Sequence, residues 1–70
     1  MDRTLVDSEV LRSVGYDRDA QTLEIEFVRG SVYRYFSVPA HVYESIMIAI
    51  SKGRYFQTQI DGKYRFVRVL

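Results

Sequence analysis

The most regular pattern in the chain is an alternation of apolar and polar residues over positions 22–27. Successive side chains of a β-strand point to opposite faces, so this segment has one apolar face and one polar face. The polar face carries Glu24 and Glu26. The pattern predicts a half-buried antiparallel strand with both glutamates on its solvated side. The apolar face is formed by Leu23, Ile25 and Phe27.

The segments before this strand are also predicted to be extended. Residues 11–17 form a strand that carries Val14 and Tyr16 on one face. Residues 17–20, Asp-Arg-Asp-Ala, form a turn because aspartate side chains bond to nearby backbone N–H groups. Residues 1–9 are predicted to be an extended lead-in to this hairpin.

The length of the next loop decides which residues of the following strand face the core. A two-residue loop would place Ile25 opposite Arg34, which puts a charge on the apolar face. A three-residue loop with Gly30 in the left-handed conformation places Ile25 opposite Tyr33. The same register sets Arg34 across from Glu24, and because these opposite charges attract, we expect the second register.

This register assigns a face to each residue of the strand at 32–36. Tyr33 and Tyr35 point toward the core, and the alternative for this pair is an aromatic platform on which unpaired bases stack. The opposite face is predicted to be a partly exposed strip, either covered by the N-terminal segment or available to a protein partner. The strip consists of Val32, Arg34 and Phe36.

Apolar residues recur at helical spacing after Pro39, whose fixed φ suits the first turn of a helix. We expect a helix over residues 39–50 that covers the sheet. Ser51 is a favourable N-cap for a second, short helix, which Gly62 ends. Residues 64–70 are rich in aromatic residues and valine and predict a final strand. The predicted inward-facing residues are Val42, Tyr43, Ile46, Met47, Ala49 and Ile50 in the first helix and Tyr55, Phe56 and Ile60 in the second.

The predicted order of elements is βββααβ, which is an α+β fold. A three-stranded antiparallel meander and a C-terminal strand form a small sheet, packed by one amphipathic helix and a second short helix. Seventy residues are enough for a single domain. Hydrophobic residues make up 47% of the chain, and six Tyr and four Phe supply large buried areas, to which a homodimer would add more.

The composition argues against several classes of protein. There is no cysteine for disulfides or thiolate metal sites, and the single histidine, His41, cannot hold a metal ion alone. No nucleophile stands beside a base, so we predict no catalytic residue, no metal and no cofactor. The N-terminus lacks the pattern of a signal peptide, and no apolar run approaches the ~20 residues of a membrane span. We expect a globular cytoplasmic protein.

Positive charge is concentrated near the C-terminus. Residues 1–51 carry five arginines and eight acidic residues, whereas residues 52–70 carry five basic residues and one acidic residue. Lys52, Gly53 and Arg54 open the second predicted helix, where free N–H groups attract anions. Either they contact a phosphate, or they only join the two helices. The remaining basic residues, Lys63, Arg65 and Arg68, add positive charge to the same end of the chain, and alone they are expected to form only a solvated strand face.

Four motifs, taken in order, resemble the KTSC domain. They are Ser13-Val14-Gly15-Tyr16-Asp17, Leu23-Glu24-Ile25-Glu26-Phe27, Val32-Tyr33-Arg34-Tyr35-Phe36 with Val38-Pro39, and Ser51-Lys52-Gly53-Arg54-Tyr55-Phe56. The resemblance covers about residues 10–69, and Tyr33 and Tyr35 match the central Tyr-x-Tyr of the family. KTSC domains occur at the C-terminus of some lysyl-tRNA synthetases and as stand-alone small proteins in bacteria and phages.

The resemblance implies an RNA-related role, because a domain attached to a tRNA synthetase works beside tRNA. Two departures weaken a phosphate contact at the C-terminal end: Gln57 stands where relatives often carry Asn, and residues 61–64 are less basic than in many relatives. We expect a non-enzymatic binding module that contacts a tRNA-like RNA through phosphates. The alternative is a protein–protein or self-association module that uses the strip on the 32–36 strand.

Overall fold

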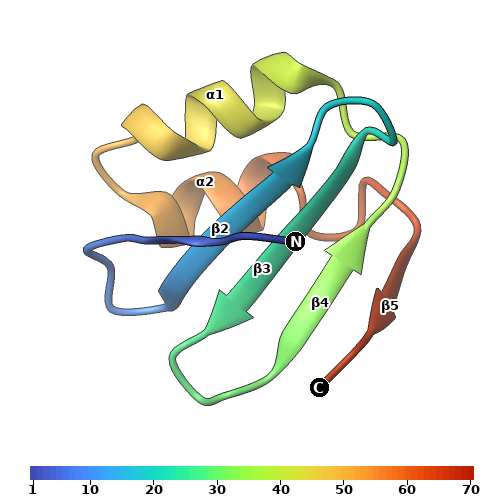
Figure 1. Cartoon of the computed structure of the whole chain (residues 1–70). Coiled ribbons are helices and arrows are strands. Elements are labelled where there is room, and N and C mark those ends of the chain that lie inside the picture. Colours follow the sequence, from blue (N-terminus) through green and yellow to red (C-terminus); the bar gives the residue numbers. More distant parts are fainter.

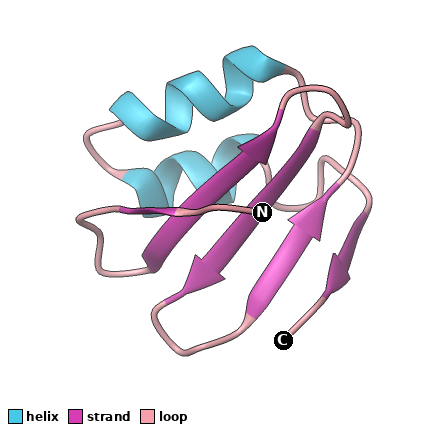
Figure 2. Cartoon of the chain, viewed as in Figure 1, coloured by secondary structure: helices cyan, strands magenta, loops and turns pink.

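The computed structural model describes residues 1–70 and contains one sheet and two helices. The elements are β1 (Thr4–Leu5), β2 (Leu11–Asp17), β3 (Thr22–Phe27), β4 (Val32–Tyr35), α1 (Ala40–Ile48), α2 (Lys52–Gln59) and β5 (Phe66–Arg68). The strands lie in the order β1-β2-β3-β4-β5, each antiparallel to its neighbours. Both helices pack on the same side of the sheet (Figures 1 and 2). The predicted α+β fold is confirmed, with one addition: the lead-in contains a paired strand, β1.

The register predicted for the β3–β4 hairpin is confirmed. Ile25 lies opposite Tyr33, and Glu24 lies opposite Arg34. The Phe27 N–H bonds to the Ser31 carbonyl at 2.9 Å, which leaves a loop of three residues, and the Gly30 N–H bonds to the Phe27 carbonyl at 2.8 Å. Gly30 has a φ of 103°, which favours glycine because a Cβ would crowd the backbone. Local turn chemistry therefore sets which residues of β4 face the helices.

The first helix is shorter than its apolar spacing predicts. Pro39 is its N-cap, but α1 ends at Ile48, and Ala49 is already extended with a ψ of 137°. The prediction that Ile50 faces the core is wrong, because its side chain is fully exposed. The backbone leaves the helix at Ala49, and α2 begins at Lys52. Ser51 caps α2 as predicted, since its hydroxyl accepts a 3.2 Å hydrogen bond from the Arg54 N–H.

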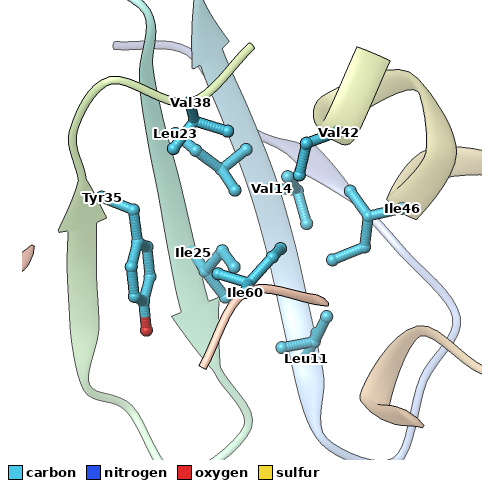
Figure 3. Close-up of a cluster of buried hydrophobic side chains, with 9 residues drawn as sticks. All are labelled: Leu11, Val14, Leu23, Ile25, Tyr35, Val38, Val42, Ile46 and Ile60. Atoms are coloured by element: carbon cyan, nitrogen blue, oxygen red, sulfur yellow. The ribbon is translucent and has the colours of Figure 1, made fainter. Parts of the chain in front are cut away.

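The core lies between the sheet and the two helices. Ile60, at the C-cap of α2, is completely buried and reaches toward Ile25 of β3 (Figure 3). Tyr35 supplies the one aromatic ring of the buried cluster. The cluster is formed by Leu11, Val14, Leu23, Ile25, Tyr35, Val38, Val42, Ile46 and Ile60.

The face of the sheet away from the helices is also covered, contrary to the prediction for Glu24. Glu24 is only 3% exposed. Its carboxylate pairs with Arg3 of the N-terminal segment and accepts a 2.6 Å hydrogen bond from the Arg34 Nε. The N-terminal segment crosses in front of β2 on this face (Figure 1). A buried, doubly paired carboxylate therefore replaces the predicted solvated glutamate, while Glu26 remains partly exposed.

The charge pair at Glu24 predicts an acid-sensitive fold. Burial by itself would raise the pKa of Glu24, but the hydrogen bonds and charges of Arg34 and Arg3 outweigh it and lower that pKa below its ordinary value. A carboxyl with a lowered folded-state pKa stabilises the fold above its unfolded pKa, and this contribution is lost as the pH falls through the folded value. We expect the free energy of unfolding to fall on acidification from neutral pH.

Urea denaturation at several pH values measures this effect. Glu24→Gln should reduce the pH dependence below the ordinary glutamate pKa. The matched control is Glu44→Gln, whose carboxylate forms an exposed pair with Arg18 and contributes little. If both variants retain the pH dependence of the unmodified chain, Glu24 does not carry it.

Candidate functional site

The six candidate basic-site residues fall into two separate groups. Lys52, Gly53 and Arg54 form the first turn of α2, where a Cβ on Gly53 would lie 3.0 Å from the Val10 side chain just before β2. The other three lie in the segment before β5 and in β5 itself, which is an edge strand of the sheet (Figure 1). The two groups lie toward the same end of the chain in the sequence but belong to different elements of the fold. This second group is Lys63, Arg65 and Arg68, here called the C-terminal basic group.

The start of α2 has mixed charge. A hollow of about 560 Å³ opens there, and it is lined by Asp7 and Glu9 as well as by Lys52 and Arg54. The Lys52 ammonium donates a 3.0 Å hydrogen bond to the Ala49 carbonyl at the end of α1. These contacts fit the joint between two helices, and the two carboxylates oppose the approach of a phosphate.

The C-terminal basic group lacks acidic partners. All three side chains belong to exposed residues, and none forms a salt bridge; the bridges of the chain involve Arg3, Arg12, Arg18 and Arg34. The Arg68 Nε donates to the Leu70 carbonyl at 3.1 Å, and the Arg65 guanidinium lies 6.0 Å from the centre of the Phe36 ring. Neither contact involves an acidic side chain, so no aspartate or glutamate pairs with the basic residues at this edge of the sheet.

Tyr33 and Tyr35 face the helices, as predicted, but they also line a second hollow. Tyr35 is 4% exposed, and Tyr33 is half-buried. The Tyr35 ring lies 5.8 Å from Phe66, its neighbour on β5. The hollow has a volume of about 340 Å³ and is here called the aromatic hollow. It is lined by Phe27, Tyr33, Tyr35, Phe56, Asp61 and Phe66.

The sequence pattern did not indicate this hollow. Asp61 and Phe66 follow Tyr35 by more than twenty residues, and only the pairing of β5 with β4 brings Phe66 beside it. Burial, together with the negative charge of Asp61 and the neighbouring Tyr33, raises the pKa of the Tyr35 hydroxyl. A tyrosine hydroxyl is protonated at neutral pH even without this shift, so it can donate a hydrogen bond.

One residue of the strip predicted on the other face of β4 is buried. Val32 is 2% exposed, whereas Arg34 is exposed although it pairs with Glu24, and Phe36 is half-buried. The prediction of an exposed apolar strip is wrong for Val32 because the N–H groups of Val69 and Leu70 bond to its carbonyl and bring the C-terminal residues against β4. The exposed apolar residues lie instead along β5 and the residues after it. They are Phe66, Val67, Val69 and Leu70.

Two further properties concern metals and membranes. No group of three or more His, Cys, Asp or Glu side chains lies close enough to bind a metal ion. Neither helix has the length and apolar character needed to cross a membrane.

Comparison with known proteins gives consistent matches. A lysine–tRNA ligase of Nostoc punctiforme is 45% identical over 60 residues, which cover 86% of this chain and 11% of the ligase. The chain thus spans about a tenth of that enzyme. A protein of Stutzerimonas stutzeri is 41% identical over 70 residues, with 99% of each chain covered.

A solved structure and a family profile agree with these matches. The crystal structure of a KTSC domain protein from Yersinia pestis superimposes with a TM-score of 0.93 at 38% identity, and covers 99% of this chain and 97% of its own. The profile of the KTSC domain matches residues 7–64. These residues include every element from β2 through α2, and with them Tyr33 and Tyr35. The chain therefore belongs to the KTSC domain family.

Proposed function

We propose that this chain is a non-enzymatic RNA-binding module that contacts phosphates through its C-terminal basic group. The observation that carries the proposal is the absence of any acidic partner for Lys63, Arg65 and Arg68. An unpaired exposed cation can neutralise a phosphate without first breaking an internal salt bridge. Such contacts position a nucleic acid without reading its sequence.

Two further observations support an RNA ligand. Aromatic rings lie directly beside the basic group, since Tyr35 is opposite Phe66 and Tyr33 is opposite Arg68. Aromatic rings next to positive charge are the usual means of binding single-stranded nucleic acid. In addition, lysine–tRNA ligases contain a segment similar to this chain.

The start of α2 supports this function less well. Lys52 already bonds to the Ala49 carbonyl, and Asp7 and Glu9 line the same hollow. Phosphate contact by Lys52, Gly53 and Arg54 thus remains a weaker part of the proposal.

Titration of a short single-stranded RNA at several salt concentrations tests the function. The logarithm of the affinity should fall linearly with the logarithm of the salt concentration, by roughly 0.7 for each phosphate contact. We expect Arg65→Ala and Arg68→Ala each to reduce this slope by about that amount. Arg18→Ala removes the same charge from the β2–β3 turn and should leave the slope unchanged.

If the chain does not bind RNA at low salt, or if replacing the whole basic group with alanine leaves the affinity unchanged, this edge does not hold RNA. Loss of binding in a Lys52→Ala, Arg54→Ala variant alone would move the site to the start of α2.

Self-association is the second candidate function, and the exposed edge of the sheet favours it. β5 has a neighbour on one side only, and the apolar side chains of Phe66, Val67 and Leu70 are exposed there. An edge strand with exposed apolar residues can pair with a second chain. Light scattering over a range of concentrations measures this, and a dimer that Val67→Lys disrupts would support it.

A further inference from the structure

Three polar groups in the aromatic hollow have no partner within the chain. The hydroxyls of Tyr33 and Tyr35 and the carboxylate of Asp61 form no side-chain hydrogen bond, and Asp61 forms no salt bridge. Tyr35 is only 4% exposed, and its hydroxyl points away from the end of the core that contains Leu23 and Val38 (Figure 3). None of these polar atoms is cut off from solvent, since the chain has no buried side-chain polar atom without a hydrogen-bond partner, so all three remain available to hydrogen-bond a ligand in the hollow.

The walls of the hollow suit a flat aromatic ligand. Phe66 is 53% exposed, and its ring lies 5.6 Å from Tyr33 and 5.8 Å from Tyr35. Behind them, Phe27 and Phe56 pack edge to face at 5.2 Å. Exposed aromatic rings stack with bases that are not paired in a duplex. The volume of about 340 Å³ lies within the range of small-molecule sites, roughly 300–1,000 Å³.

The single carboxylate determines which base fits best. A carboxylate only accepts hydrogen bonds, and its two oxygens can accept two parallel bonds from adjacent donors. Guanine alone among the four RNA bases has two adjacent donors on its pairing edge, N1–H and the N2 amino group. Adenine and cytosine place a ring acceptor beside their amino group, and uracil has one donor between two carbonyls.

We propose that the aromatic hollow binds the base of an unpaired guanosine nucleotide, with Asp61 accepting hydrogen bonds from its pairing edge. Phe66 provides the stacking surface, and the protonated Tyr35 hydroxyl is available as a donor to the base. The nucleotide phosphate lies toward Arg68, which is opposite Tyr33 and therefore flanks the hollow. This inference rests on the proposed function, because it names the nucleotide that the RNA-binding edge selects.

The surrounding charge favours a nucleotide over an organic cation. Aromatic rings with one carboxylate are also found where ammonium groups bind. Here, however, Arg68 lies opposite Tyr33 and flanks the hollow, and a cation without an acidic partner repels a positively charged ligand. In a nucleotide, the neutral base can donate hydrogen bonds to the Asp61 carboxylate while the anionic phosphate is attracted to Arg68.

Nucleotide titration followed by NMR tests the site directly. The four ribonucleoside 5′-monophosphates are added separately to the full chain, and we expect guanosine monophosphate to bind tenfold or more tightly than the uridine, adenosine and cytidine nucleotides. Asp61→Asn should remove most of this preference, because an amide presents a donor where an acceptor is needed. Asp19→Asn changes the same charge in the β2–β3 turn and should preserve the preference.

A second arm uses RNA and separates this inference from the proposed function. An oligouridylate with one central guanosine is compared with the all-uridine strand. Salt-dependent binding of both strands with equal affinity, together with equal affinity for all four nucleotides, overturns the guanosine site and leaves RNA binding in place. Selective binding of guanosine monophosphate without binding of either strand overturns the RNA function and keeps the site. Tighter binding of tetramethylammonium than of guanosine monophosphate also overturns the guanosine site.

Discussion

Replacement of Ile60 by alanine should remove most of the stability of this protein. Ile60 is completely buried at the C-cap of α2 and belongs to the cluster that joins both helices to the sheet (Figure 3). Truncation of a buried isoleucine costs about 2–5 kcal/mol, because the transfer free energy is lost and a cavity remains. A core of 70 residues supplies only about 3–5 kcal/mol in total. The chain has no disulfide to compensate.

Urea denaturation followed by circular dichroism measures this loss. The matched control is Ile48→Ala, which removes the same atoms from a side chain that is 84% exposed. We expect the control to change the free energy of unfolding by less than about 0.5 kcal/mol. Equal denaturation midpoints for the two variants would contradict the core described for α2.

Replacement of Gly15 by alanine should displace the N-terminal segment. A Cβ at this position would lie 2.5 Å from the backbone oxygen of Asp2 and 3.0 Å from the Arg3 side chain. Because the closest atom belongs to the backbone, a side-chain rotation cannot relieve the clash. The displacement would also separate Arg3 from Glu24, which leaves the buried carboxylate with Arg34 alone. Overpacking of this kind costs about 1–3 kcal/mol.

A shortened chain provides the control for this prediction. Removing residues 1–3 takes away both the atoms that clash with the new Cβ and the Arg3 partner of Glu24. In the shortened chain, Gly15→Ala should therefore cost little, and the two changes should be strongly non-additive. The free energies of unfolding of the four chains, from urea denaturation, give the coupling. If Gly15→Ala costs the same in both backgrounds, the N-terminal segment does not lie over β2.

Much of the fold follows from local rules that the sequence displays. The alternation at residues 22–27 predicted β3, the Val28-Arg29-Gly30 loop predicted the β3–β4 register, and Ser51 predicted the start of α2. Each of these depends on neighbours within a few residues. The same kind of rule failed at Ile50, where helical spacing continued past the point at which the chain leaves α1.

The candidate site was predicted less completely, because it combines residues far apart in the chain. Tyr33 and Tyr35 were recognised as inward-facing, but the hollow beside them also needs Asp61 and Phe66. The basic residues were identified by type, yet their division between the start of α2 and the β5 edge depends on how the elements pack together.

The sequence by itself determined β2, β3 and β4, the register of the hairpin between β3 and β4, and the N-cap of α2, because turn geometry and side-chain periodicity act over a few residues. Only the tertiary structure decided that the second face of the sheet is covered. The alternating pattern places Glu24 among the solvated residues of β3, and its burial requires Arg3 from a distant segment. The tertiary structure likewise decided that Phe66 meets Tyr35 to form the aromatic hollow, since strand pairing across thirty residues leaves no local pattern.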